Sequence, residues 1–338
     1  MPGLLRKLCA IAVVLLLATG AGSAQDKITL RFAQPWPASH PQWVHGGRVF
    51  VDYVTKATNG EVEFELYHSA QLGDDSLGLL TSGLTDLALM SSGYAADRLP
   101  LSNVAELPGI FVSACDANRK FRKIATKGGA LFENEYKAFR LHPIYMAMSP
   151  PASLVMGHGK VARLDDVKGL KLRASGGGAT EIAHSLGGVP VQTVASELYD
   201  ALKRGTIDGA IYYYVGMPSF SLEDVFKSGV DNLRFGSTSV FTAMTEDRWA
   251  QMPPNVQKAM TEGATLAEQS LCKWFDENEA GIRNKMVSER GFQAISLPQD
   301  DIERWNALKT EIADSWAKRM DDNGRKGTEV LEDFRAAE

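Results

Sequence analysis

The sequence predicts an α/β protein of two lobes, in which mainly parallel sheets are flanked by helices. Short strands alternate with helical segments before residue 100 and again after residue 141, a pattern typical of parallel sheets covered on both faces. A chain of 338 residues is long enough for two separate cores. A long amphipathic segment after residue 253 predicts a helix that could brace both lobes.

The first series of elements begins with a strand, because Ile28, Leu30 and Phe32 alternate with polar residues. A helix is expected over residues 42–58, where apolar side chains recur at helical spacing until Asn59-Gly60 ends the pattern. The next expected elements are a strand at 61–66, a helix at 77–83 and a strand at 87–91.

A second series of elements follows Leu141. Strands are expected near 143–148, 154–156, 171–173, 189–192 and 207–211, and helices near 180–186 and 196–204. The second of these helices carries Ser196 as its expected N-terminal cap and Glu197 in its first turn, where a carboxylate favours the helix dipole. These strands and helices predict a second α/β lobe.

Two helices are predicted in the last third of the chain. Val256, Met260, Ala264 and further apolar residues lie on one stripe of a helix that runs from Pro253 towards Val287, roughly 50 Å in length. Residues 329–334 are expected to close a C-terminal helix that packs against one lobe.

The first 24 residues have the pattern of a secretory signal peptide, which predicts a periplasmic location. Arg6 and Lys7 precede an apolar run, and Gly22-Ser23-Ala24 provides a cleavage site of small residues. No later stretch approaches the roughly 20 apolar residues that a membrane helix needs. Without the signal peptide the chain keeps 34 basic and 41 acidic side chains, a net charge of −7, so nucleic acid is a poor partner.

Two cysteines, Cys115 and Cys272, remain after such cleavage. In an oxidising compartment they could form a disulfide, but their distance in sequence fixes nothing about their geometry. Two separately buried thiols are the alternative. The sequence leaves this question open.

The segment around Arg173 carries the strongest indication of a binding site. Lys171-Leu172-Arg173 reads as a short strand that delivers its arginine into Ser175-Gly176-Gly177-Gly178. A guanidinium presents a fixed fork of donors that pairs both oxygens of a carboxylate at once. In a chain of negative net charge, an acidic solute needs a local positive group of this kind.

Strings along nearly the whole mature chain resemble the solute-binding proteins of TRAP transporters, the tripartite ATP-independent periplasmic carriers whose founding members bind C4-dicarboxylates. Besides the Arg173 segment they are Arg31-Phe32-Ala33, His40-Pro41, Thr58-Asn59-Gly60, Gln71-Leu72-Gly73, Glu106-Leu107-Pro108 and Trp249-Ala250-Gln251-Met252-Pro253. The resemblance implies a periplasmic binding protein fold of the type II-like form, with a long helix spanning both lobes. It also implies a small and a large membrane permease subunit as partners, without nucleotide hydrolysis.

The resemblance further implies that the chain crosses between the lobes more than once. We expect residues 25–150 with 239–278 in lobe I, and residues 151–238 with 279–338 in lobe II. In this family the arginine of the Lys-Leu-Arg string clamps the solute carboxylate, so Arg173 is the expected clamp.

Other candidates lie on loops near the predicted strand ends, where two facing lobes form their cleft. The candidate ligand-binding residues besides Arg173 are Ser175, Gly176, Tyr212, Tyr214, Trp36, Gln71, Ser92, Tyr94 and Ser153. For each of them an ordinary role in a turn or in packing is the alternative. Alternation along an extended strand sends Tyr213 to the face opposite Tyr212 and Tyr214.

Some positions depart from the relatives. Many of them carry asparagine in place of Tyr212 and an aromatic residue in place of Ala195, so we expect a reshaped pocket. The second arginine of sialate-binding relatives is not found at residues 148–153. A ligand with two carboxylates would therefore need another cation, whereas a monocarboxylate, a hydroxy acid or an aromatic acid would not.

The sequence contains no recognisable motif for catalysis, a metal or a cofactor. The six histidines form no His-Glu-x-x-His pattern, and Asp74-Asp75 lacks the ligands of a calcium loop. We therefore expect a monomeric receptor that captures a small organic acid and delivers it to a membrane permease. Two alternatives stay open: a small organic amine held by Tyr212, Tyr214 and Trp36 through cation–π attraction, or an enzyme on the same fold.

Overall fold

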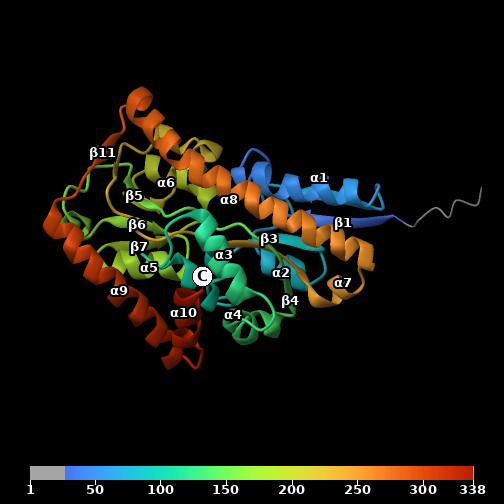
Figure 1. The fold of residues 1–338 in the computed structure, drawn as a ribbon. Helices are drawn as coiled ribbons and strands as arrows, with labels where there is room; N and C mark the ends of the chain where they lie inside the picture. The colour runs from blue at the N-terminus through green and yellow to red at the C-terminus, as the bar shows by residue number, and fades with distance from the viewer. Residues whose placement is uncertain (1–26, 338) are drawn as a thin grey trace, which may run out of the picture.

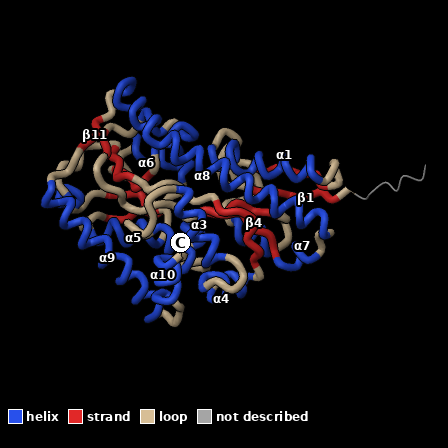
Figure 2. The backbone as a smooth tube through the Cα atoms, in the orientation of Figure 1, coloured by secondary structure: helices blue, strands red, loops and turns tan. Residues whose placement is uncertain are grey.

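The computed structural model describes residues 27–337 and contains two β-sheets, with one long helix running past both (Figure 1). The first sheet has the strand order β2-β1-β3-β10-β4, and the second has the order β11-β9-β5-β8-β6-β7. The strands are β1 (Ile28–Ala33), β2 (Val62–Tyr67), β3 (Leu87–Ser91), β4 (Leu141–Met146), β5 (Ser153–Met156), β6 (Lys171–Ala174), β7 (Val189–Gln192), β8 (Gly209–Tyr212), β9 (Ser228–Val230), β10 (Val240–Thr245) and β11 (Gln293–Ile295). Helices surround the strands of both halves (Figure 2). The predicted α/β class with two lobes is confirmed.

Both sheets mix parallel and antiparallel pairs. The expected parallel pairs are present, since β1 runs parallel to β2 and β3, and β6 runs parallel to β7 and β8. In contrast, β10 is antiparallel to β3 and β4, and β5 is antiparallel to β8 and β9. These antiparallel strands flank the points where the chain leaves the first sheet after β4 and returns to it after β9. The expectation of mainly parallel sheets did not include these pairs, because residue periodicity indicates a strand but not the direction of its neighbours.

The two crossings lie between Met146 and Ser153 and between Val230 and Val240. The boundaries expected after residues 150 and 238 fall within them, and the assignment of whole lobes stays a prediction. The C-terminal helix α10 (Gly327–Ala336) packs against α3 (Ala114–Ala125), α4 (Ala130–Asn134) and α9 (Gln299–Asp322).

Each predicted helix is present with local differences, but residues 114–125, 130–134, 246–250 and 299–322 form helices that were not predicted from the sequence. The α-helices are α1 (Arg48–Ala57), α2 (Ser76–Thr81), α3 (Ala114–Ala125), α4 (Ala130–Asn134), α5 (Gly177–Ser185), α6 (Leu198–Lys203), α7 (Glu246–Ala250), α8 (Pro254–Arg290), α9 (Gln299–Asp322) and α10 (Gly327–Ala336). The helix expected at 42–58 begins with a π-helical turn, η1 (Gln42–Gly47). The cap expected at Ser196 is wrong, because a 3-10 turn, η6 (Ala195–Glu197), precedes α6 and moves the cap positions to Val194 and Glu197.

Helix α8 is the predicted long helix, and at about 1.5 Å per residue it extends about 55 Å. It packs against α1, α3 and β4 on one side and against the 3-10 helix η7 (Tyr214–Phe220) further along (Figure 1). Its carboxylates accept hydrogen bonds from backbone N–H groups of two separate segments: Asp276 from Ala114 at 2.7 Å, and Glu279 from Tyr214 at 2.7 Å. The helix therefore joins elements of both sheets through polar contacts as well as packing.

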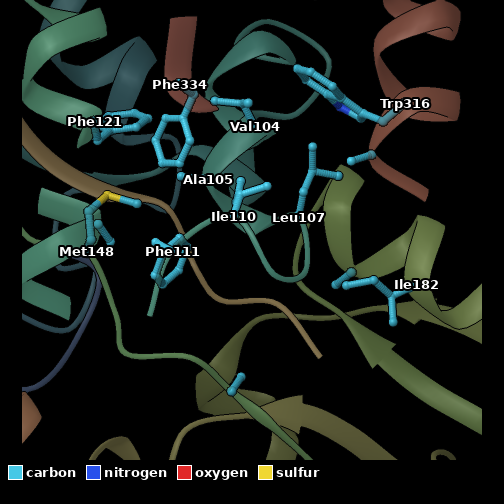
Figure 3. Packing of buried hydrophobic residues seen from close by; sticks show 14 of the residues in the cluster. Val104, Ala105, Leu107, Ile110, Phe111, Phe121, Met148, Ile182, Trp316 and Phe334 are labelled. Atoms are coloured by element: carbon cyan, nitrogen blue, oxygen red, sulfur yellow. The ribbon is translucent and has the colours of Figure 1, made fainter. Parts of the chain in front are cut away.

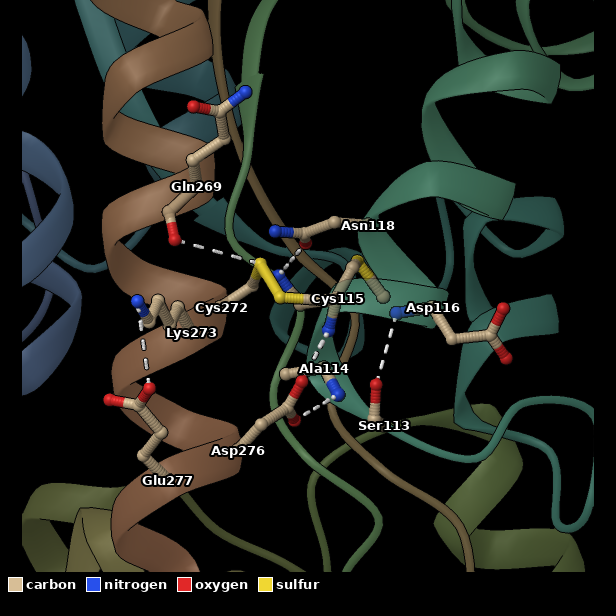
Figure 4. The surroundings of a disulfide bond; sticks show 11 residues. Ser113, Ala114, Cys115, Asp116, Asn118, Gln269, Cys272, Lys273, Asp276 and Glu277 are labelled. Carbon is tan, nitrogen blue, oxygen red and sulfur yellow. Dashed lines mark hydrogen bonds and ion pairs between the residues drawn. A yellow bond between two sulfur atoms is a disulfide. The ribbon is translucent and has the colours of Figure 1, made fainter.

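A disulfide between Cys115 and Cys272 fixes the start of α3 to α8 (Figure 4). The two Cα atoms lie 4.8 Å apart, and the bond closes a loop of 157 residues. Beside it, Asp276 accepts the backbone N–H groups of Ala114 and Cys115, and Oγ of Ser113 accepts the N–H of Asp116. The sequence left this pairing open, and the structure decides in its favour.

A continuous hydrophobic core connects the two halves (Figure 3). Val104 and Leu107, on and beside the 3-10 helix η3 (Leu101–Glu106), belong to the same cluster as Ile182 of α5, Trp316 of α9 and Phe334 of α10. These side chains are almost fully buried. The segment between β3 and β4 therefore packs directly against elements of the second half.

Among residues 27–337 no helix combines the length and apolar character required to cross a membrane. The expected signal peptide of residues 1–24 lies outside the described residues and stays a prediction.

We expect the Cys115–Cys272 bond to contribute about 2–5 kcal/mol to the free energy of unfolding, because it restricts a long loop in the unfolded chain. Urea unfolding with and without a thiol reductant should show this loss. A Cys115→Ser/Cys272→Ser double variant should already have the lower stability and should not respond to the reductant. Equal stability of the oxidised and reduced protein would contradict the prediction.

Candidate ligand-binding site

Arg173 lies buried near the end of β6, with 3% of its surface exposed. Its Nε donates a hydrogen bond to the carbonyl oxygen of Thr193 at 3.1 Å, and its guanidinium carbon lies 5.7 Å from the ring centre of Tyr212. Within the described part of the chain, no carboxylate lies at ion-pair distance from it, and the remaining N–H groups of its fork form no hydrogen bond there. A buried guanidinium with this partial set of partners is suited to an anion that presents two oxygens.

Tyr212 and Tyr213 form a stacked pair beside this arginine. Their ring centres lie 5.0 Å apart, with an angle of 2° between the ring planes. Because β8 ends at Tyr212, the alternation expected across the three tyrosines does not continue, and the prediction that Tyr213 faces away from Tyr212 is wrong. Burial raises the pKa of both phenols, and each is also influenced by the charge of Arg173.

The loops after β3 and β6 approach each other closely across the cleft. A Cβ atom on Gly93 would lie 2.2 Å from the carbonyl oxygen of Ser175, and one on Gly176 would lie 2.4 Å from Cα of Gly93. Only glycine permits such an approach. A second contact lies nearby, where the hydroxyl of Tyr94 accepts the backbone N–H of Ala195 at 3.1 Å. Of the predicted residues, Ser175, Gly176 and Tyr94 thus meet where the two sheets' loops face each other.

Glu106 lies fully buried behind these loops, and it was not among the predicted site residues. Its carboxylate accepts the N–H of Gly178, in the first turn of α5, at 3.2 Å. With its amide nitrogen turned toward Glu106, Asn103 lies 3.3 Å from both carboxylate oxygens and 3.2 Å from Oγ of Ser92. Burial raises the pKa of Glu106 to about 8, although the N–H of Gly178 and the charge of Arg173 act in the opposite direction. An acidic residue within the apolar run from Leu101 to Phe111 was the sequence signal that could have indicated it.

A cavity of about 380 Å³ lies at this meeting point, within the size range of ligand pockets. Trp36, Asp74 and Tyr94 line it from loops that follow β1, β2 and β3. Val194 and Ser196 line it from the loop that follows β7, next to the Thr193 carbonyl bound by Arg173. The cavity is therefore bounded by loops of both sheets. Arg173 does not line it, but the guanidinium binds the Thr193 carbonyl of one of these loops.

The sequence matches a family model described as bacterial extracellular solute-binding protein, family 7, over residues 32–319. The chain belongs to this family. The predicted resemblance to TRAP solute-binding proteins is thereby confirmed. Among curated proteins, this solute-binding protein is 22% identical to the outer membrane transporter protein TsaT of Comamonas testosteroni, over 98% of its own length and 97% of that protein's.

Two solved structures resemble the fold of this solute-binding protein. One is a TRAP solute-binding protein from Rhodoferax ferrireducens T118 in complex with copurified benzoate, with a TM-score of 0.81, 22% identity and coverage of 92% and 97% of the two chains. The other is a marine metagenome TRAP solute-binding protein in complex with 3-hydroxybenzoate, with a TM-score of 0.80, 20% identity and coverage of 91% and 97%. At this level of identity the comparisons establish the two-lobed fold.

The remaining predicted residues lie in different surroundings. Gln71 is in an exposed turn, and Ser153 begins β5 opposite Tyr212 in the sheet register. Tyr214 packs edge-on to Phe292 and lines a separate cavity with Asp231 and Arg234. Trp36, Tyr212 and Tyr214 therefore do not form the cage on which the amine alternative depends.

A larger cavity, of about 670 Å³, lies on the outside of the first lobe between α3, β4, α7 and α8. Arg122, Ile144 and Trp249 are among the residues that line it, and it contains none of the predicted site residues. Its most buried cation, Arg122, is already bound by Glu268. Within residues 27–337 no cluster of histidine, cysteine and acidic side chains is suited to a metal ion. The smaller cavity, bounded by the loop that Arg173 binds, is therefore the candidate solute site.

Glu106 should make the stability of this solute-binding protein depend on pH. Its pKa rises from 4.5 to about 8 on folding, so its stabilising contribution is complete below pH 4.5 and is lost as the pH rises through 8. A Glu106→Gln variant can still accept the N–H of Gly178 but cannot ionise. Relative to this variant, the native protein should lose about 1.4 kcal/mol of unfolding free energy per pH unit between about pH 5 and 8.

Urea unfolding at several pH values measures this difference. Glu197→Gln removes an exposed carboxylate from the neighbouring loop and serves as the control, whose stability should follow that of the native protein. Parallel pH profiles for native protein and Glu106→Gln would show that Glu106 is not the responsible group.

Proposed function

We propose that this protein binds a small organic acid with a single carboxylate in the cleft beside Arg173. The observation that carries the proposal is a buried guanidinium that has one carbonyl partner, one aromatic neighbour and, among the described residues, no carboxylate. Burying such a charge is costly unless an anion compensates it. A solute carboxylate would supply this compensation with both of its oxygens.

The body of the solute is proposed to be aromatic. Tyr212 and Tyr213 present flat rings beside Arg173, and Trp36 and Phe220 line the adjoining cavity. Stacked or edge-on contact with such rings favours a planar apolar ligand. Two relatives of the same fold were solved with benzoate and with 3-hydroxybenzoate, which supports the same class of ligand.

Binding is proposed to close the two lobes over the solute. Arg173 and Tyr212 belong to the second sheet and its loops, whereas Trp36 and Tyr94 follow strands of the first. A solute that contacts both sets does so only when the lobes are shut, and this difference in contact energy shifts the equilibrium toward the closed form. The closed form would then be recognised by a small and a large membrane permease subunit, with the monomeric receptor acting in the periplasm after removal of its signal peptide.

An enzymatic role is not supported. It requires a nucleophile or metal beside a general base in the cleft. Glu106, the fully buried acidic group behind the loops, has its oxygens occupied by Gly178 and Asn103. The proposed role is therefore that of a receptor, without a catalytic residue or cofactor.

Replacing Arg173 by glutamine should weaken binding of benzoate by about 10² to 10⁴, because a desolvated charge pair loses one partner. A thermal-shift panel of aromatic acids, dicarboxylates and small amines first identifies the best acid, and titration calorimetry with that acid then compares the variants. Lys171→Gln is the matched control, since it removes a positive charge from the exposed side of the same strand. Undiminished acid binding by Arg173→Gln, or stabilisation by amines alone, would refute the proposal.

A further inference from the structure

Glu106 is a buried acidic residue at the point where three segments of the chain meet. Its carboxylate accepts the N–H of Gly178 at 3.2 Å, and its backbone carbonyl accepts the N–H of Ser237 at 3.4 Å. Gly178 lies in α5, which follows a strand of the second sheet, and Ser237 lies in the crossing between β9 and β10. Glu106 itself ends η3, which follows β3 of the first sheet. The residue therefore joins both sheets and one crossing.

Glycines enclose the side chain of Glu106. A Cβ atom placed on Gly176 would lie 2.8 Å from its Oε2, and one placed on Gly93 would lie 3.1 Å from its Oε1. A Cβ atom on Gly178 would lie 2.5 Å from Cβ of Glu106. The residue has no exposed surface, so it acts on a solute only through the groups around it.

Arg173 connects this carboxyl group to the proposed solute site. Its strand, β6, ends at Ala174, and the loop that follows contains the Gly176 that packs against Glu106. The two side chains form no ion pair within residues 27–337, but the charge of Arg173 still lowers the pKa of Glu106. Burial outweighs this effect and raises that pKa to about 8. At neutral pH Glu106 is therefore mostly uncharged and does not compensate the guanidinium.

The interaction between the two groups is reciprocal. Because the positive charge of Arg173 favours ionisation of Glu106, an ionised Glu106 offsets part of that positive charge. A solute carboxylate held by Arg173 would offset the same charge, so the two anions compete for one cation. Binding of the solute should therefore raise the pKa of Glu106 and draw in a proton.

The other titratable groups near η3 act elsewhere. Glu135 accepts the N–H groups of Leu101 and Ser102 at the opposite end of η3, and burial raises its pKa to about 7. The remaining charged or titratable side chains of the segments packed against η3 are exposed or have partners of their own; they are Tyr94, Tyr136, Glu181, His184, Asp231, Arg234, Glu329, Glu332, Asp333 and Arg335. The charge that acts on Glu106 is thus that of Arg173.

We propose that Glu106 is a positioning residue of the solute site, which holds the loop after Arg173 and, while uncharged, leaves the charge of the guanidinium to the solute. This inference rests on the proposed function, because it assumes that Arg173 holds the solute carboxylate. Ionisation of Glu106 at alkaline pH places a competing anion behind the same arginine. Acid binding then weakens as the pH rises, and near the midpoint of this change each bound solute brings in part of a proton.

Calorimetric titration from pH 6 to pH 9, with benzoate or the best-bound monocarboxylate of the thermal-shift panel, tests this proposal. Such a solute keeps its charge throughout, since carboxylic acids ionise near pH 4. The phenols of Tyr212 and Tyr213 stay neutral because burial raises their pKa. We expect the affinity of the native protein to fall about five- to tenfold between pH 7 and pH 9. Glu106→Gln, which cannot ionise, should show no such fall.

A control variant and a second measurement separate this role from a purely structural one. Glu135→Gln removes another buried carboxyl group whose pKa is raised, and it should keep the pH profile of the native protein. Titrations of the native protein at pH 8 in two buffers of different ionisation enthalpy measure the protons taken up on binding. We expect up to about half a proton per solute, because about half of the Glu106 side chains are ionised at that pH. Glu135→Gln should keep this uptake, and Glu106→Gln should lose it.

The inference is overturned if the affinity of the native protein does not change between pH 7 and pH 9, if no proton is taken up at pH 8, or if Glu106→Gln keeps the native profile. A native profile that disappears in Glu135→Gln would assign the effect to the wrong end of η3 and would also overturn it. If Glu106→Gln does not fold or does not bind, the proton uptake of the native protein and of Glu135→Gln decides the question.

The proposed function is judged by a different result. If acids bind in an Arg173-dependent manner with an affinity that is independent of pH, the acid-binding function stands and the inference about Glu106 fails. If no acid of the panel binds the native protein, or if the acids bind equally to Arg173→Gln, the proposed function itself fails and the inference fails with it.

Discussion

A buried arginine is the constraint on which the proposed function depends. Arg173 is removed from water at the end of a short strand, and the protein compensates its charge only in part, with the Thr193 carbonyl and the Tyr212 ring. Such a group is tolerated in a folded protein when another anion can approach it. The loops around it supply a cavity in which that anion could be a solute.

Helix α8 holds together segments from both halves of the chain. Its carboxylates Asp276 and Glu279 bind backbone N–H groups of α3 and η7, and the Cys115–Cys272 bond joins α3 to it covalently. The shared hydrophobic core between the halves adds packing to these polar contacts. We therefore propose that the lobes move while α8 and the segments bound to it keep their arrangement. The free energy of solute binding is then used for lobe closure.

Two hydrogen bonds also join segments from different parts of the chain near the candidate site. Tyr94 binds the backbone of Ala195, and Glu106 binds the first turn of α5. Tyr94 lies about 100 residues before Ala195 in the chain, so this contact could be found only in the folded structure.

The sequence alone predicted the strands from β1 to β8 and the long helix, and it singled out Arg173 as a candidate, because periodicity and a local motif are properties of neighbouring residues. It did not determine the disulfide, the Tyr212–Tyr213 stack or the burial of Glu106 beside α5. Each of these depends on how segments distant in the chain meet. The sequence thus indicated the charge that is proposed to receive the solute, whereas the shape and polarity of its surroundings were decided by tertiary packing.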